Sequence, residues 1–172
     1  MTNKPKLIAI AAVAIDGTIG IDNKIPWKIP EDFKHFRKTT MGSVLIVGAT
    51  TYHTLPDKAF EGRDYILLSN KKQFTINRKN VYQFNNIDNM LTFLSNYHTN
   101  KVFVIGGASI YETLIDYCDE AIITMVNMCP DGNKFFPIEK LKNDFKILNE
   151  NSSTWLKNKT GIEYKVIYFK RK

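Results

Sequence analysis

Asp32 is the residue whose position most clearly suggests chemistry. We expect it to lie in a helix, because Pro30 suits a first helical position, where its fixed φ is helical and its missing N–H loses no partner. At about 100° per residue, Ile29, Phe33 and Phe36 share one narrow face, and Asp32 lies at its edge. Asp32 could be an ordinary acidic residue of a first helical turn, which the helix dipole favours. It could also be a carboxylate in an apolar cleft that accepts hydrogen bonds from adjacent N–H donors of a ligand.

A second candidate site is the pair Gly106-Gly107, between a predicted buried strand and a predicted helix. At such a junction, backbone N–H groups can approach an anionic phosphate at the N-terminus of the helix. A Gly-Gly pair is also typical of a plain tight turn. The pair alone therefore leaves both interpretations open.

These candidates must be positioned by the strands and helices around them. Short apolar runs rich in β-branched residues predict buried strands at Lys6–Ile15, Ser43–Val47, Asp64–Leu68, Val81–Phe84, Lys101–Ile105, Ala121–Val126 and Glu163–Phe169. Helix patterns lie between them, at Glu31–Thr39, Thr50–Leu55, Ile87–Tyr97 and Ser109–Tyr117. This alternation predicts crossover connections and a largely parallel sheet, and the last third, with little helical patterning, predicts an antiparallel strand. The fold class is α/β, in a single domain over residues 1–172.

Composition and length agree with one globular domain. The 172 residues are 44% hydrophobic and 24% charged with no biased tract, which argues against disorder. Cys118 and Cys129 are too few for a disulfide scaffold or a CxxC zinc site, and they fit free thiols in a reducing compartment. The longest apolar run, Leu7–Ile15, has nine residues, about half of a membrane span, and it is a poor signal peptide. We therefore expect a cytoplasmic protein that does not associate with membranes.

The chain carries an excess of positive charge, with 24 Lys and Arg against 17 Asp and Glu and a formal net charge of +7. Such an excess attracts any anion, whether nucleic acid, acidic membrane or phosphorylated cofactor. A nucleic-acid-binding domain would need Lys and Arg clustered on one face together with exposed aromatic side chains. Here the charges are dispersed along the sequence and the aromatic residues follow apolar patterns, so nucleic acid is not expected as the main partner.

The segment Ile19–Phe33 bears directly on Asp32. It reads IGIDNKIPWKIPEDF and closely resembles the signature of the dihydrofolate reductase family: I-G, a short polar loop, then P-W-x-x-P-x-[DE]. The resemblance covers nearly the whole chain. Ala9–Gly20 is similar to the family's first strand and active-site loop, Val44–Leu55 to its cofactor-holding strand and helix, Val102–Tyr111 to its I-G-G-x-x-[IV]-Y segment, and Phe135–Pro137 to its late F-F-P turn.

The resemblance implies a central, mixed and mostly parallel eight-stranded sheet flanked by about four helices, with an adenosine-binding subdomain at roughly 42–98. It also implies reduction of 7,8-dihydrofolate to tetrahydrofolate in one-carbon metabolism. The hydride passes from the nicotinamide of NADPH to C6, and a proton reaches N5. We also expect a target of antifolates that holds no metal. One small domain with no surplus of amphipathic surface favours a monomer.

The resemblance implies four catalytic residues. Asp32 would accept hydrogen bonds from the 2-amino group and the N3 side of the pteridine, and its charge would favour the protonated, more electrophilic substrate. Thr124 would bond the Asp32 carboxylate, and Tyr111 would lie near the nicotinamide. Trp27 would hold an ordered water with its indole N–H, or would be plain core packing.

The same resemblance implies a substrate pocket lined by apolar side chains that could equally be ordinary core: Ile25, Phe33, Phe36 and Leu55. Arg63 would pair in a bidentate manner with the α-carboxylate of the substrate's glutamate, with Arg37 assisting, unless Arg63 is an unrelated surface arginine. Ile10 and Ile105 would offer backbone carbonyls to the pterin ring.

The cofactor site implied by the resemblance consists mainly of backbone groups and small polar side chains. Ala12 and Ile19 would contact the carboxamide, Thr51 would contact the phosphates, and the Gly-Gly pair carries a cis peptide in this family. The full set is Ala12, Ile19, Gly20, Gly48, Ala49, Thr50, Thr51, Ser69, Asn70, Lys71, Gly106, Gly107, Ser109 and Ile110.

The sequence departs from the family pattern around this cofactor site. Ala49 stands where the family usually has a basic residue for the adenosine 2′-phosphate, and Ser109 stands where some members have arginine. Asn133 and Lys134 replace the usual Asp-Thr before Phe-Phe-Pro, which we expect to alter docking of the active-site loop. Lys71 and Lys72 could supply the missing positive charge or could be a solvated pair. NADPH is the expected cofactor, with NADH as the open alternative.

A rival interpretation is a reductase of the same fold that acts on a ribosylated pyrimidine in flavin synthesis. It would share the sheet and the Gly-Gly pair, but we would not expect it to contain the P-W-x-x-P-x-D segment. That segment favours dihydrofolate reductase.

Overall fold

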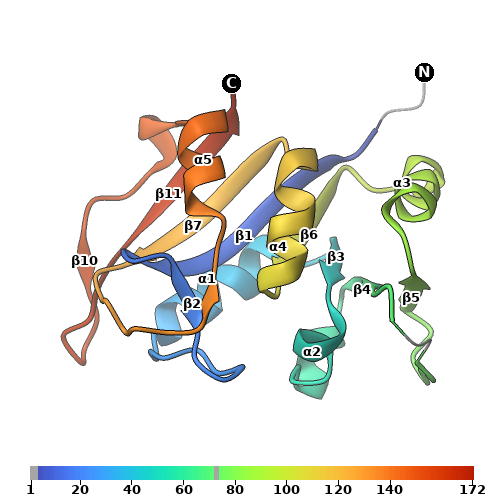
Figure 1. Ribbon diagram of the computed structural model, residues 1–172, viewed down its shortest axis with the longest axis horizontal. Helices are drawn as coiled ribbons and strands as arrows, with labels where there is room; N and C mark the ends of the chain where they lie inside the picture. Colours follow the sequence, from blue (N-terminus) through green and yellow to red (C-terminus); the bar gives the residue numbers. More distant parts are fainter. Residues whose placement is uncertain (1–3, 72–73) are drawn as a thin grey trace.

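A single large sheet forms the frame of the computed structural model, which describes residues 4–71 and 74–172 (Figure 1). Its strands are β1 (Lys6–Ala14), β3 (Val44–Val47), β4 (Asp64–Leu68), β5 (Val81–Phe84), β6 (Lys101–Gly106), β7 (Glu120–Val126), β9 (Phe145–Ile147), β10 (Leu156–Lys157) and β11 (Glu163–Arg171). Eight of them lie in the order β10-β11-β7-β1-β6-β3-β4-β5. β9 joins β10 on the outer edge of β11, so the predicted eight-stranded width is confirmed.

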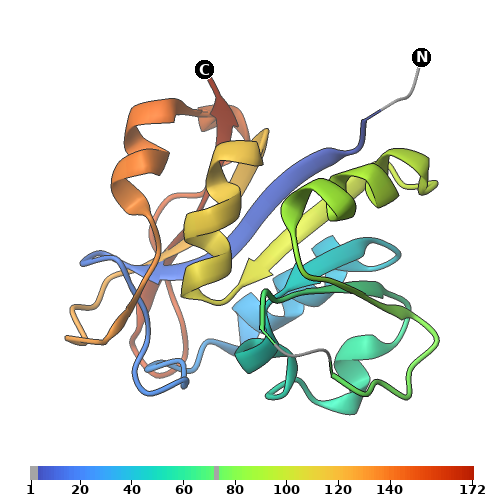
Figure 2. The same cartoon turned by 45° about the vertical axis from the view of Figure 1, so that its right-hand side comes forward.

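The sheet is mixed and mostly parallel, as predicted. β7, β1, β6, β3, β4 and β5 run parallel to one another, and β11 runs antiparallel to β7. From β1 the chain moves outward to β5 and then returns to place β6 between β1 and β3. In Figure 2, the green segments with β5 and α3 (Ile87–Asn96) lie on one side of the blue β1, and the orange and red segments with α5 (Ile138–Asp144) and β11 lie on the other.

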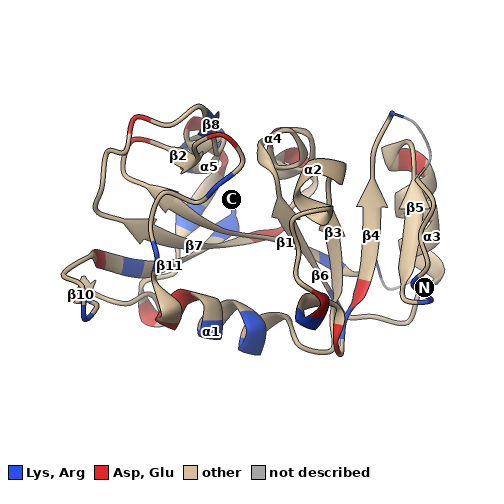
Figure 3. Ribbon diagram, turned by 90° about the horizontal axis from the view of Figure 1, so that it is seen from below, with Lys and Arg blue, Asp and Glu red and all other residues tan. Residues whose placement is uncertain are grey.

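Both faces of the sheet are covered, which explains the uninterrupted apolar runs of the strands. On β1, Leu7 and Ala9 belong to one buried cluster, and Ile8 and Ile10 belong to another on the opposite face. The first cluster packs against α3, α4 (Ala108–Leu114) and α5, and the second packs against α1 (Pro30–Thr40). Figure 3 shows α1 on one side of the sheet and α4 and α5 on the other.

The local sequence of α1 explains where this helix begins and ends. Pro30 occupies its first turn together with Glu31 and Asp32, and basic residues occupy its last turn, so both ends complement the helix dipole. The hydroxyl of Thr40 donates to the carbonyl of Phe36 at 2.8 Å, and Gly42 follows with a φ of +74°. The prediction of Glu31–Thr39 is therefore confirmed to within one residue at each end.

Among the remaining helices, the apolar periodicity of the sequence predicts α3 well and the others poorly. α3 matches its prediction, but α2 (Ala49–Tyr52) is one turn long and ends before Pro56, and the predicted helix Ser109–Tyr117 ends as α-helix at Leu114 and continues as a 3₁₀ turn. Helix α5 is not predicted by the sequence. Its seven residues bury only Leu141, which gives no periodic pattern to detect. None of the helices within the described ranges is long and apolar enough to cross a membrane.

A small second sheet is also absent from the prediction. β2 (Thr18–Gly20) pairs with β8 (Lys134–Phe135) in antiparallel orientation, placing Gly20 opposite Lys134. These strands have three and two residues, too few for the alternation that identifies a strand. The pairing joins the loop after β1 to the segment before α5, and it forms one wall of the site described next.

Candidate active site

A cavity of about 1250 Å³ lies at the carboxyl ends of the parallel strands. Residues at or just after the ends of β3, β4, β5 and β6 line it, which is the usual position of a ligand site in an open α/β sheet. Pockets for one small molecule typically measure about 300–1,000 Å³. The cavity therefore has room for two ligands side by side.

Asp32 projects into this cavity from the first turn of α1. The hydroxyl of Thr124 on β7 donates to a carboxylate oxygen of Asp32 at 2.5 Å. Burial raises the pKa of Asp32, and the Thr124 hydrogen bond and the His35 imidazole partly oppose that increase. The ion pairs found among the described residues do not include Asp32. It is thus a half-buried acceptor whose second oxygen can receive N–H donors from a ligand.

Tyr111 reaches the same region from α4 on the other face of the sheet. Its hydroxyl donates to the backbone carbonyl of Ile10 at 2.6 Å. The β1–β6 register ends at Ala9 and Val104, so β1 and β6 separate where the tyrosine enters. Burial raises the pKa of Tyr111, which keeps its hydroxyl neutral and able to donate. The Ile10 carbonyl retains one lone pair for a ligand.

Arg63 is buried, with 4% of its surface exposed, and it lines the cavity rather than the outer surface. Its guanidinium donates to the hydroxyl of Thr40 at 3.0 Å and to the carbonyls of Glu61 and Arg37 at 2.8 Å each. A guanidinium has five N–H groups, so two remain for a ligand. Arg63 is therefore not a surface arginine, and its contact with the substrate stays a prediction.

The apolar side chains of the cavity differ in exposure. Ile25 is 51% exposed and Phe33 is 49% exposed, so neither is ordinary core. Phe36 and Leu55 are partly buried and pack against the cluster formed by Ile8 and its neighbours while also lining the cavity. Large apolar side chains left exposed at the mouth of a cavity indicate a surface that a ligand covers.

Two predicted site residues do not line the cavity. Trp27 is buried and packs with Ala14, Val126 and Tyr164, which are the contacts expected of core packing. Its role in holding a water molecule stays a prediction. Gly106 lies behind the cavity wall, and the expected cis peptide joins it to Gly107, which does line the cavity.

We predict that Gly106→Ala destabilises the protein by about 2–4 kcal/mol. The φ of Gly106 is +105°, and an added Cβ would lie 2.7 Å from the Tyr111 ring. The ring would have to move, and the hydrogen bond from its hydroxyl to Ile10 would weaken. Urea unfolding measures this loss. A wild-type midpoint would show that the tyrosine can shift freely.

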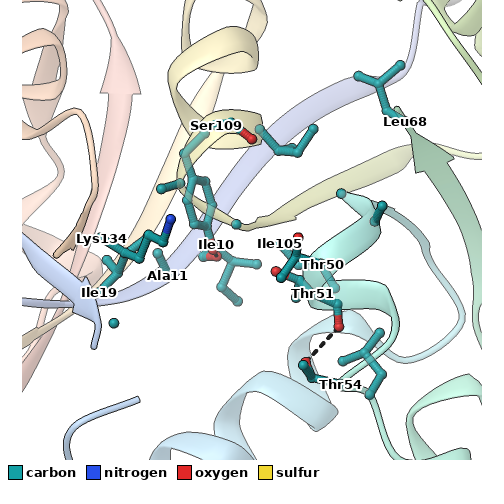
Figure 4. A pocket seen from close by; sticks show the side chains of 18 of the residues that line it. Ile10, Ala11, Ile19, Thr50, Thr51, Thr54, Leu68, Ile105, Ser109 and Lys134 are labelled. Atoms are coloured by element: carbon teal, nitrogen blue, oxygen red, sulfur yellow. Dashed lines mark hydrogen bonds between the residues drawn. The ribbon is translucent and has the colours of Figure 1, made fainter. Parts of the chain in front are cut away.

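The predicted cofactor residues do gather at the cavity, with the exception of Gly106. Figure 4 shows Thr50 and Thr51 side by side on α2 and Ser109 on α4. The cavity-lining members of the predicted set are Ala12, Ile19, Gly20, Gly48, Ala49, Thr50, Thr51, Ser69, Asn70, Lys71, Gly107, Ser109 and Ile110. Lys72 lies outside the described residues.

Charge is sparse where the cavity wall follows β4, β5 and β6. Among the described residues there, Lys71 is the one cation and Asp88 the one anion. Asn85 and Asn86 complete the wall after β5 with neutral amides. Sequence reasoning did not include Asn85–Asp88. The predicted strand Val81–Phe84 could have indicated them, because residues at the carboxyl ends of parallel strands face the site.

His35 and Lys134 are further lining residues that the sequence did not assign to the site. His35 lies one turn after Asp32 on α1, and its Nε2 atom is buried with no hydrogen-bond partner within the described ranges. Lys134 enters through the β2–β8 pairing, which the sequence did not predict. The other unassigned lining residues are Ala11, Asn23, Lys24, Thr54, Pro56, Lys58, Ala59, Leu68, Ala108, Thr113 and Tyr117.

The loop before Asp32 is held in place by Asn133. The side-chain oxygen of Asn133 accepts from the backbone N–H of Asp22 at 3.0 Å, and its amide donates to the Asp22 carboxylate at 2.8 Å. The backbone N–H of Asn133 donates to the Gly20 carbonyl at 3.1 Å. A carboxylate at position 133 would repel Asp22, so the asparagine fits this contact. Within the described ranges, no group of three or more His, Cys, Asp or Glu could hold a metal ion.

Comparison with known proteins identifies the family. The sequence match to the family described as dihydrofolate reductase spans residues 6–171. The chain is 35% identical to the dihydrofolate reductase of Mycoplasma genitalium over 147 residues, covering 84% of this chain and 89% of that protein. It is 34% identical to dihydrofolate reductase type 9 of Escherichia coli over 162 residues, covering 91% and 89%. The chain belongs to the dihydrofolate reductase family.

The fold agrees with membership of the dihydrofolate reductase family. The chain is similar to dihydrofolate reductase from Enterococcus faecalis, solved in complex with NADP(H) and RAB-propyl, with a TM-score of 0.83 and 22% identity. The similarity covers 98% of this chain and 97% of that one. At that identity the likeness supports the architecture, and the sequence relatives support the family.

Proposed function

We propose that this chain is an NADPH-dependent dihydrofolate reductase, with Asp32 as the residue that holds and polarises the substrate. The observation that supports this proposal most strongly is the state of the Asp32 carboxylate. It is half-buried, bonded by Thr124, unpaired with any cation among the described residues, and open to a cavity large enough for two ligands. A buried charge without a fixed partner is costly, so it indicates a ligand that supplies the partner.

The side chains of the cavity match successive parts of the dihydrofolate molecule. Asp32 offers a carboxylate oxygen to the 2-amino and N3 edge of the pteridine. Phe33, Phe36 and Leu55 offer an apolar wall to the two ring systems. The two remaining N–H groups of Arg63 suit the α-carboxylate of the glutamate.

The cavity wall that contains Gly48, Thr51 and Gly107 fits a dinucleotide. The backbone is closely packed there, because an added Cβ at Gly48 would lie 2.8 Å from Ile110 and one at Gly107 would lie 3.0 Å from the Thr51 hydroxyl. The first turn of α4 leaves N–H groups without helical partners, and these suit phosphate oxygens. When bound, NADPH supplies the hydride.

The chain's own residues contribute orientation, charge and exclusion of water. The negative charge of Asp32 stabilises the protonated form of the bound pteridine, which is the better hydride acceptor. Ile25 and Phe33 cover the mouth of the cavity with apolar surface. Asp32 need not touch N5, because a water molecule can carry the proton to that atom.

The purified protein should oxidise NADPH only when dihydrofolate is present, and antifolate diaminopyrimidines should inhibit it. The loss of reduced-nicotinamide absorbance measures the rate. A parallel series with NADH tests whether Ala49, in place of the usual basic residue, changes the preference for NADPH. Oxidation that does not depend on dihydrofolate, or no oxidation at all, would contradict the proposal.

Replacing Thr124 by valine should shift the pH–rate profile of the enzyme to higher pH. The Thr124 hydrogen bond lowers the pKa of Asp32 against the effect of burial, so its loss raises that pKa further. The carboxylate is then ionised only at higher pH. We expect the apparent pKa in kcat/KM to rise. An unchanged profile would show that Thr124 does not act on Asp32.

We further propose that residues at roughly 42–98 form an adenosine-binding subdomain. They include β3, β4, β5, α2 and α3, and they contribute Gly48–Thr51, Ser69–Lys71 and Asn85–Asp88 to the cavity wall.

Both Cys118 and Cys129 are free thiols, which supports a reducing, cytoplasmic location. We propose a monomer that binds dihydrofolate and antifolates, with no nucleic acid or membrane partner, and sedimentation equilibrium tests the monomer.

A further inference from the structure

Lys134 is held at the edge of the cavity by a contact that the sequence pattern does not reveal. The β2–β8 pairing places it opposite Gly20. A Cβ added at Gly20 would lie 3.5 Å from the Cβ and 3.7 Å from the Cγ of Lys134, so the lysine stem packs directly over the glycine. The stem is thereby directed along the cavity wall. Figure 4 shows the ammonium pointing into the cavity beside Ile19, on the side that faces Ser109 and α4.

This ammonium has no acidic partner among the residues that the structure describes. The ion pairs and side-chain hydrogen bonds found within residues 4–71 and 74–172 include none from Lys134. The two acidic residues that line the cavity are Asp32, at the start of α1, and Asp88, after β5. A cation that points into a cavity without a protein acid beside it suits an anionic group of a ligand.

The position of Lys134 indicates which anionic group this is. The glutamate carboxylates of the substrate belong at Arg63, which is fixed to the carboxyl-terminal half of α1 through Arg37 and Thr40. Lys71, which lines the cavity after β4, is the cation expected to supply the charge for the 2′-phosphate. Lys134 is at neither of these two positions. It faces the first turn of α4, which contains Ser109.

We propose that Lys134 binds the diphosphate bridge of the dinucleotide cofactor from the β2–β8 side, opposite the first turn of α4. The inference rests on the proposed function, since it requires a dinucleotide in this cavity. The contact is with a group that NADPH and NADH share, so it strengthens the binding of both without selecting between them. Lys134 would thus add positive charge on the side of the cavity that faces Ser109, where some family members have arginine.

Equilibrium binding of NADPH and of NADH to the whole protein, measured by calorimetry without substrate, tests this proposal. Lys134→Met should raise the Kd for both dinucleotides by the same factor, about three- to tenfold. Lys134→Arg should keep most of the affinity, and the effect of Lys134→Met should shrink at high salt because the contact is electrostatic. The matched control is Lys146→Met on β9, an exposed lysine away from the cavity, which should leave both Kd values unchanged.

The outcomes separate this inference from the proposed function. Wild-type protein that binds neither dinucleotide would contradict the proposed function itself. Wild-type binding with an unchanged Kd in Lys134→Met would overturn the role of Lys134 alone. A rise for NADPH but not for NADH would also overturn it, because the lysine would then contact the 2′-phosphate. Circular dichroism of Lys134→Met and Lys134→Arg verifies that both variants are folded.

Discussion

Asp32→Asn is expected to lower the rate of hydride transfer at neutral pH by about 10²–10⁴-fold, the range typical for loss of a group that controls protonation. Asparagine keeps the shape of the side chain and can still accept one hydrogen bond. It removes the negative charge that favours the protonated pteridine. Asp32 lies on α1 and not among the residues that line the cofactor wall, so NADPH affinity should change by no more than about twofold. Single-turnover kinetics and NADPH titration measure the two quantities separately.

The same substitution should make the protein more stable. Burial raises the pKa of Asp32 above its ordinary value of 3.8. A raised pKa means that the folded state favours the protonated form, so stability falls as pH rises from 3.8 through the folded-state pKa and stays lower above it. Asparagine cannot ionise and avoids this loss, and we expect Tm at neutral pH to rise by about 2–4 °C.

Glu31→Gln is the matched control for Asp32→Asn. Glu31 is the neighbouring carboxylate in the same turn of α1, but it is exposed and does not line the cavity. It should leave the rate of hydride transfer unchanged. A wild-type rate for Asp32→Asn, or an equal loss in both variants, would remove Asp32 from its proposed role.

Arg63→Leu is expected to raise KM for dihydrofolate by about 100-fold, because the substrate's carboxylate would lose a bidentate, charge-assisted partner. The variant also loses the bonds to Thr40, Glu61 and Arg37, so its free energy of unfolding should fall by about 1–3 kcal/mol. Arg63→Lys keeps the charge but not the planar fork, and its KM should be intermediate.

A substrate without the glutamate separates the two effects of Arg63. Dihydropteroate has no α-carboxylate, so wild type and Arg63→Leu should reduce it with the same KM at a temperature where both are folded. An equal rise in KM for dihydropteroate would show that Arg63 acts only by supporting α1 and the loop after it.

The main sheet could be predicted from the sequence because its strands are buried on both faces. The apolar runs at Leu7–Ile15 and Val102–Ile105 are long enough for burial to dominate their composition. The β2–β8 pairing could not be predicted, because Thr18–Gly20 and Lys134–Phe135 are held by backbone hydrogen bonds and carry no apolar alternation. Helix α5 is missed for a similar reason, since Leu141 is its one buried residue.

The candidate site was predictable where a motif fixes spacing. Helical periodicity places Asp32 and Phe36 on the cavity side of α1, and both line the cavity. The buried state of Arg63 was not predictable, because two of its three acceptors are backbone carbonyls that carry no sequence signal. The place of Lys134 depends on the unpredicted β2–β8 register, so its sequence position alone could not assign it to the site.

The central claim is that this cavity brings a nicotinamide and a dihydropteridine together for hydride transfer to C6. The most direct measurement follows the transferred atom. NADPH that carries deuterium at the transferable position of its ring is incubated with dihydrofolate and the purified protein, and the folate product is examined by NMR. The account predicts tetrahydrofolate with deuterium at C6, and the Asp32→Asn variant should form the same product far more slowly. Tetrahydrofolate without deuterium at C6, or no tetrahydrofolate from folded wild-type protein, would contradict the account.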